Sequence, residues 1–276
     1  MTRAQTITAV VLVIAAVSAL LCWAVRASVS PLAPAFAAPL SAWIVAWLGL
    51  QAVALVAVFH PRTPLCGRIT GRGRPPTPAI AITFDDGPTE PYTSQILDVL
   101  KTHEARATFF VLGARAGTAP AALKRAVADG HELGNHTWDH PALVLHSPRY
   151  IRETIRRTSD AIAVAAGVRP RLFRAPFGWR NPWVGRAARA EGCDPVAWTT
   201  GVHDTDRPGA DAIAQRSIAA LEDGAILLLH DGRSFDPQPD ASQVVEALPR
   251  IVAEARRRGY RMITLSEMLR ESAARS

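Results

Sequence analysis

Acidic residues are missing from the first 84 positions of this 276-residue chain, although 24 Asp and Glu residues occur in the remainder. Cysteine is scarce as well: Cys22, Cys66 and Cys193 are the only three, and they lie far apart. An odd, scattered set of this kind predicts neither a disulfide framework nor a cluster of zinc-binding cysteines. We therefore expect the cysteines to be small apolar residues rather than reactive thiols.

A nucleic-acid-binding stripe is also missing, although the formal net charge is +7. The Lys and Arg residues are scattered over segments that also carry Asp and Glu, and no aromatic residues alternate with them. We expect no nucleic acid among the partners of this chain. We expect some of these positive side chains to be attracted to anionic lipid headgroups instead.

Two long apolar runs occupy residues 7–25 and 40–59. Each has about the 20 residues that a helix needs to cross the ~30 Å hydrocarbon core of a bilayer. Trp43 and Trp47 lie near the start of the second run, as is typical of the headgroup level. A cleaved signal peptide is the alternative for the first run. We predict two transmembrane helices within a membrane anchor at residues 1–61.

Positive charges flank both outer ends of these runs, with Arg3 before the first and four arginines within residues 62–74 after the second. Only Arg26 lies in the turn between them. The positive-inside rule then places the rest of the chain at the cytoplasmic face of a cell membrane. Residues 62–78 are rich in Pro, Gly and Arg and are expected to form a basic linker.

From residue 79 onward, short apolar runs alternate with segments that carry helix signals. Ser147-Pro148 and Asn181-Pro182 are typical helix starts, and Gly167 and Gly192 are typical stops. The expected strands are 79–84, 107–112, 132–135, 172–175, 195–199, 225–229 and 260–265. Strands that alternate with helices predict a parallel sheet. We expect residues 79–276 to form an α/β domain, a distorted (β/α)7 barrel that is closed or nearly closed.

Chemically unusual residues follow the expected strands, at the edge where sites form in α/β folds. Asp85 and Asp86 end the first strand and precede a Gly-Pro turn. Neighbouring side chains on an extended chain point in different directions, so one carboxylate could bind a metal while the other acts as a base. The alternative is a turn with two solvated acids.

Two histidines, His136 and His140, follow the third strand. Four residues apart, they would share one face of a helical turn and could reach the same ion. His131 precedes that strand and does not fit the spacing. Two histidines and a strand-end carboxylate make a recurrent catalytic zinc shell with open positions.

Arg174 and His230 end two further strands. An arginine beside carboxylates can keep one of them ionised and oriented. A histidine at the end of an apolar strand is either satisfied in the core or positioned for proton transfer, and the residues alone leave both open.

Four motifs in this order resemble the polysaccharide deacetylase family, carbohydrate esterase family four: Thr83–Pro88, His136–His140, Arg174–Phe177 and Leu228–His230. The resemblance covers about residues 79–268. It implies that Asp86, His136 and His140 bind a divalent metal, with Zn²⁺ preferred and Co²⁺, Ni²⁺ or Mn²⁺ as alternatives. It also implies that Asp85 is the catalytic base and that Arg174 orients it.

The same resemblance implies that His230 is the general acid, that Asp204 supports it, and that the Phe177 N–H binds an oxyanion. The sequence departs from the family at Gly201–Thr205, where an Asp and a groove-shaping Trp are missing. We expect a metal-dependent hydrolase that removes an N-acyl group, acetyl in our prediction, from an amino sugar of a polysaccharide or lipid-linked glycan. Alternatives are deformylation or hydrolysis of another small or lipid-linked amide, and non-catalytic glycan binding on the same fold.

Overall fold

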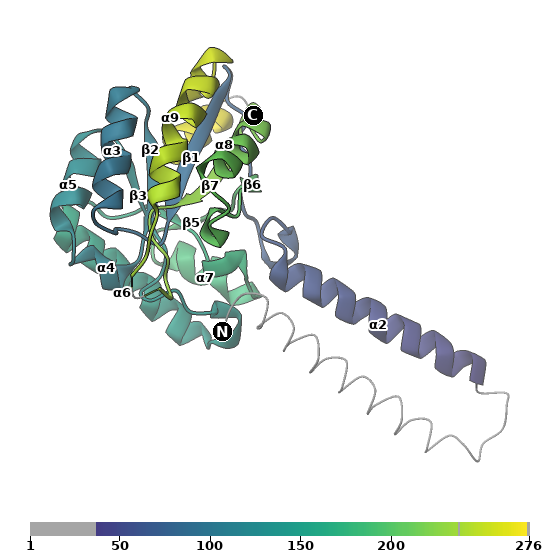
Figure 1. Cartoon of the computed structure of the whole chain (residues 1–276). Coiled ribbons are helices and arrows are strands. Elements are labelled where there is room, and N and C mark those ends of the chain that lie inside the picture. The colour runs from purple at the N-terminus through teal and green to yellow at the C-terminus, as the bar shows by residue number, and fades with distance from the viewer. Residues whose placement is uncertain (1–36, 237, 275–276) are drawn as a thin grey trace. The chain divides into compact units, whose positions relative to one another are not determined.

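The computed structural model describes residues 37–236 and 238–274 (Figure 1). The chain divides into two compact units, the first ending at His60 and the second beginning at Pro61. Helix α2 (Ala37–Phe59) belongs to the first unit. All the strands of the described part belong to the second unit, which is described by itself below.

The second unit is built on a sheet of eight parallel strands. They are β1 (Ala79–Asp85), β2 (Ala107–Val111), β3 (Glu132–Asn135), β4 (Leu172–Phe173), β5 (Asp194–Pro195), β6 (Thr200–Gly201), β7 (Ile226–His230) and β8 (Arg261–Met262). The order is β5-β4-β3-β2-β1-β7-β6, and β8 pairs with the first two residues of β1. Because the pairs are parallel, the carboxyl ends of the strands meet at one edge.

Helices connect the strands and cover the sheet (Figure 1). They are α3 (Tyr92–Thr102), α4 (Gly113–Ala116), α5 (Pro120–Ala128), α6 (Pro148–Ala166), α7 (Pro182–Ala190), α8 (Ala210–Ala219), α9 (Ser242–Arg257) and α10 (Leu265–Ala273), with 3-10 turns η2 (Pro64–Cys66), η3 (Leu143–Leu145), η4 (Pro176–Gly178) and η5 (Asp204–Asp206). The Ser147 hydroxyl and the Asn181 carboxamide accept hydrogen bonds from N–H groups of the first turns of α6 and α7. Gly167, in a left-handed conformation, ends α6.

Strand β1 is buried along its whole length, and its side chains alternate between two faces. One set packs in the large core that includes α3 and α9: Ile80, Ile82 and Phe84. Ala79 and Ala81 pack instead with residues of β2, β7 and α10. Thr83 and Asp85 continue the face of the two alanines, so this second face carries Asp85 to the carboxyl edge.

The prediction of a seven-stranded (β/α)7 barrel is wrong in strand number and in closure, although the strands are parallel as expected. The sheet is a half-barrel that ends at β5 and β6. Both of these strands, and β4, are only two residues long. Closure of a barrel requires each strand to pair on both sides, and such short strands give little edge for pairing.

Helix α2 contains the second apolar run, residues 40–59, for which the sequence predicted a membrane span. In the part of the chain that the structure describes, no helix is both long and apolar enough to cross a bilayer, so this prediction is wrong. The first run, 7–25, lies outside the described residues. The cytoplasmic placement stays a prediction.

Residues 62–78, expected to be a linker, pack against the half-barrel. Thr70 forms a parallel bridge with Val196, directly after β5. The carbonyl of Gly71 accepts a hydrogen bond from the Thr199 hydroxyl, directly before β6, at 2.8 Å. The segment therefore lies beside the two strands at which the sheet ends.

Candidate metal and acid–base site

The pairing of β1 with β7 brings the first two site residues together. Asp85 is the last residue of β1, and its register partner is His230, the last residue of β7. Asp86 follows with a φ of 74°, in the left-handed region that non-glycine residues rarely adopt. This change of backbone direction lets the two adjacent carboxylates meet different partners.

Asp86, His136 and His140 form a buried group whose possible ligand atoms all lie within 4.8 Å of one another. Oδ1 of Asp86 lies 3.5 Å from Nε2 of each histidine. Among the described residues, this oxygen has no hydrogen-bond partner. Tetrahedral zinc with ligands at 2.0–2.1 Å separates them by about 3.3 Å. The group therefore fits one divalent cation and leaves coordination positions open.

The protonation of these residues suits metal binding. Nδ1 of His136 lies 2.8 Å from the carbonyl of Arg174, which can only accept, so in the neutral tautomer Nδ1 carries the proton and the Nε2 lone pair is available to a cation. Burial is the main reason why the pKa of His140 falls to about 4. Burial acts to raise the pKa of Asp86, but the nearby imidazoles, led by His140, outweigh it and lower that pKa to about 2. Deprotonated ligands are what a cation requires.

The sequence predicted that His136 and His140 share one face of a helical turn, but this turn is not formed. Thr137 and His140 have positive φ angles of 70° and 61°, so the segment is an irregular loop. Asn135 fixes this loop: its carboxamide accepts from the Thr137 N–H at 2.9 Å and donates to the Ile155 carbonyl at 2.7 Å. The imidazole centroids still lie 5.0 Å apart. The two imidazoles therefore lie close together as predicted, but through a loop and not through a helical turn.

Arg174 is fully buried and fixes Asp85. Its Nη1 donates to Oδ1 of Asp85 and to the Thr83 hydroxyl, each at 2.7 Å, and its guanidinium lies 4.0 Å from the centroid of the Phe110 ring. Burial lowers the pKa of Arg174, and the Asp85 carboxylate opposes this. The other Asp85 oxygen, Oδ2, lies 3.7 Å from Nε2 of His136. One oxygen of Asp85 is thus held in an ion pair, while the other faces the candidate metal-binding group of Asp86, His136 and His140.

His230 and Asp204 form a second pair. Nδ1 of His230 lies 3.0 Å from Oδ1 of Asp204, and the His230 N–H donates to Oδ2 at 2.8 Å. Burial acts to lower the pKa of His230, but Asp204 and then the two carboxylates at the end of β1 outweigh it and raise that pKa to about 10. The imidazole is 20% exposed, so it can reach a substrate. A protonated imidazole in this place can donate a proton.

Phe177 lies in η4 with a φ of 59°, and its ring meets that of His140 edge-on at 4.5 Å. The structure thus brings together, at one edge of the sheet, all the residues that the sequence selected: Asp85, Asp86, His136, His140, Arg174, Phe177, Asp204 and His230. The role of each residue stays a prediction.

Sequence reasoning missed the groups that hold Asp86 in place. The Ser234 N–H donates to Oδ2 of Asp86 at 3.2 Å, and Nη1 of Arg115 donates to the Asp86 carbonyl at 3.0 Å. Asp231 is buried beside Gly87, where a Cβ would come within 2.0 Å of its carboxylate, and burial raises the pKa of Asp231 to about 7. Gly87 is apparent in the sequence. The close approach of Asp231, which leaves no room for a Cβ there, becomes apparent only once β1 and β7 are known to pair.

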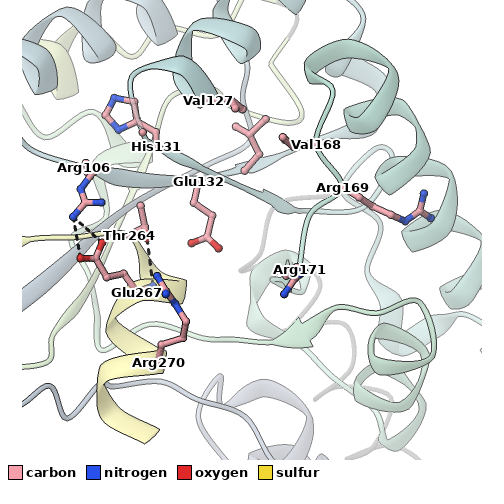
Figure 2. Close-up of a pocket in the computed structure, with 12 residues that line it drawn as sticks. Arg106, Val127, His131, Glu132, Val168, Arg169, Arg171, Thr264, Glu267 and Arg270 are labelled. Atoms are coloured by element: carbon pink, nitrogen blue, oxygen red, sulfur yellow. Dashed lines mark hydrogen bonds and ion pairs between the residues drawn. The ribbon is translucent and has the colours of Figure 1, made fainter. Parts of the chain in front are cut away.

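A pocket of about 300 Å³ lies at the opposite edge of the sheet (Figure 2). Arg106, His131 and Arg171, which line it, directly precede β2, β3 and β4. Arg106 pairs with Glu267 at 2.7 Å. The pocket contains none of the predicted site residues, so the candidate site and this pocket are separate features.

His131, at the wall of that pocket, is expected to make stability depend on pH. Its Nδ1 accepts a hydrogen bond from the Ala107 N–H at 3.2 Å, which requires the neutral ring. Burial lowers its pKa from 6.5 to about 4. Between these values the unfolded chain binds a proton that the folded chain excludes, so stability should fall as pH falls from 6.5 to 4. The loss should reach about 3 kcal/mol.

Urea unfolding of the wild type and of His131→Gln across this pH range measures that contribution. The glutamine carboxamide can still accept from Ala107 but does not titrate, so the variant should lose less stability on acidification. Equal losses in the two proteins would show that His131 does not contribute.

Comparison with known proteins agrees with this geometry. The family described as polysaccharide deacetylase matches residues 72–196. A chitooligosaccharide deacetylase from Bradyrhizobium is 38% identical over 70% of this chain and 91% of the relative. A peptidoglycan-N-acetylglucosamine deacetylase from Bacillus cereus is also 38% identical, over 69% of this chain and 88% of the relative.

Solved structures show the same fold. The peptidoglycan deacetylase PdaC from Bacillus subtilis has a TM-score of 0.64 and 32% identity, and the match covers 73% of this chain and 95% of PdaC. A CE4 family pseudoenzyme from Bacillus anthracis has a TM-score of 0.66 and 28% identity, over 73% of this chain and 68% of the other. Together with the parallel half-barrel, these relationships show that the chain belongs to the polysaccharide deacetylase family, the hydrolases that cleave amide C–N bonds of glycans.

Proposed function

We propose that this chain is a metal-dependent deacetylase that removes acetyl groups from N-acetylglucosamine residues of an oligosaccharide or polysaccharide. The observation that carries the proposal is the meeting of a metal-binding group with two separate ion pairs, Asp85–Arg174 and Asp204–His230, at one edge of the sheet. The names of the relatives support the substrate class, because they include chitooligosaccharide and peptidoglycan-N-acetylglucosamine deacetylases.

Each group has a distinct task in amide hydrolysis. A divalent cation held by Asp86, His136 and His140 would supply Lewis-acid polarisation of the amide carbonyl and of water. Asp85 accepts a proton from the attacking water, and its ion pair with Arg174 keeps it oriented. This assignment gives the two adjacent carboxylates different roles.

The later steps of the reaction need a hydrogen-bond donor for the oxyanion and a proton donor for the leaving amine. Attack on the carbonyl produces a tetrahedral oxyanion, to which the N–H of Phe177 is assigned as donor. An amine leaves readily only when it is protonated, and His230 supplies this proton while Asp204 stabilises its charged form. His230 regains a proton from solvent through its exposed edge.

Purified protein incubated with a fully acetylated chitooligosaccharide and Zn²⁺ tests the proposal. We expect acetate release and the matching mass loss of the sugar, both abolished by a chelator and restored by added metal. Absence of release with every divalent ion would instead favour the non-catalytic alternative, for which the Bacillus anthracis pseudoenzyme is a precedent. A formylated oligosaccharide as a competing substrate tests the deformylase alternative. A lipid-linked glycan remains an untested prediction of the sequence.

A further inference from the structure

The loop that follows β7, residues 231–236, carries an exposed aromatic ring beside the metal-binding group. The Phe235 side chain is 61% exposed. It nevertheless packs edge-on against the His140 ring at 5.3 Å and parallel to the Phe177 ring at 5.9 Å. Phe177 in turn stacks at 4.6 Å on Trp179, which is fully buried. An aromatic stack thus runs from the core to the surface at the site.

Polar contacts fix the backbone on which Phe235 stands. The preceding N–H, that of Ser234, is bound to the Asp86 carboxylate, and the Arg233 carbonyl accepts from Nη2 of Arg115 at 2.8 Å. After Phe235, Asp236 lies 3.6 Å from the Arg207 guanidinium. The ring is therefore held on both sides along the chain, and its position is coupled to a metal ligand.

A fixed aromatic ring that is exposed next to the candidate catalytic groups can form a ligand surface, because binding sites are lined mainly by hydrophobic and aromatic side chains. The proposed substrate has matching chemistry. A pyranose ring is polar around its rim, but its axial C–H bonds form an apolar face that can pack flat against an aromatic ring. None of the acid–base or metal roles assigned above requires Phe235.

We propose that Phe235 is a specificity-determining residue that binds the apolar face of a substrate pyranose ring and so places the acetamide over the site. This inference rests on the proposed function, since it assumes an amino-sugar substrate. Phe177 and His140 pack against the Phe235 ring, and the loop positions it relative to Asp86.

Steady-state kinetics on chitooligosaccharides of increasing length test this role. Phe235→Ala should raise KM for the oligosaccharide about 10-fold, or ~1.4 kcal/mol, with a smaller change in kcat and with metal content retained. Phe235→Tyr, which keeps the ring, should restore KM to within about 3-fold of the wild type. Val164→Ala removes another exposed apolar side chain, near the end of α6, and serves as the control.

Activity on a small acetyl ester that has no sugar distinguishes weaker sugar binding from damage to the catalytic site. The loss in kcat/KM caused by Phe235→Ala should be larger for the oligosaccharide than for the ester. Equal losses on the two substrates, loss of metal, or an unchanged KM for the oligosaccharide would overturn the inference.

Calorimetric binding in an Asp85→Asn background distinguishes failure of the inference from failure of the proposed function. Binding of the oligosaccharide that weakens with Phe235→Ala supports the inference even if the wild type releases no acetate, in which case only the proposed function fails. Binding that does not depend on Phe235, or no binding at all, overturns the inference whatever the wild-type activity.

Discussion

Replacement of His136 by alanine should remove stoichiometric metal and deacetylase activity together. His136 supplies one of three potential ligand atoms, and its Nδ1 is already committed to the Arg174 carbonyl, so Nε2 is directed at the cation. Loss of the imidazole leaves one histidine and one carboxylate, which is fewer protein ligands than a catalytic zinc site uses. Elemental analysis of the dialysed protein and acetate release from a chitooligosaccharide measure the two effects.

The matched control is His103→Ala, at the end of α3, which removes a histidine far along the chain from all three ligands. This variant should retain metal and turnover. A circular dichroism spectrum and an unfolding curve show whether each variant is folded. A folded His136→Ala protein with full metal content and activity would exclude the site.

Asp85→Asn and His230→Ala should each lower kcat by roughly 10²–10⁴-fold while metal remains bound. Asparagine keeps the size of Asp85 but cannot accept the proton of water, and alanine cannot donate to the leaving amine. Neither residue belongs to the three-residue metal group. Metal content and single-turnover acetate release are measured on the same samples. Retained metal with slow release distinguishes these two variants from His136→Ala, which should lose both. Near wild-type turnover in either variant contradicts the role of that residue.

The pH–rate profile assigns the two roles. Asp85 acts as the ionised base, so its removal should abolish the fall in rate on the acid side. His230 acts in its protonated form, so activity should fall as pH rises through its pKa, which the structure places at about 10. Asp204→Asn removes the main charge that raises this pKa, so the alkaline limb should move to lower pH. An alkaline limb that stays in place would contradict the Asp204–His230 coupling.

The long buried elements of the fold were predictable from the sequence, and the short ones were not. Strand β1 (Ala79–Asp85) was predicted to within one residue, and helix α6 (Pro148–Ala166) begins and ends at the predicted Ser147-Pro148 and Gly167 signals. Strand β6, Thr200–Gly201, was missed because two residues carry no periodic pattern. Closure and strand number were misjudged for the same reason: the length of each paired edge depends on tertiary contacts, which the sequence does not show.

Site residues were predictable where they follow apolar strands, because strand ends converge in a parallel sheet. Asp85 and His230 are examples, and their registered pairing explains why they meet. His136 and His140 meet through a loop whose left-handed residues no helical spacing describes. Phe235 stands in a loop without periodicity, so only its ring contacts with His140 and Phe177 reveal it.

The packing of residues 62–78 beside β5 and β6 bears on aggregation. An unpaired strand edge offers free N–H and C=O groups to other molecules. Thr70 pairs with one such group, because its carbonyl accepts a hydrogen bond from the Ala197 N–H at 2.8 Å. Gly73 binds the turn before β7, where its N–H donates to the Gly224 carbonyl at 2.8 Å. A chain shortened to begin at Ala79 would expose these groups, and its half-barrels would be prone to join edge to edge. We therefore expect the segment to limit self-association of the half-barrel.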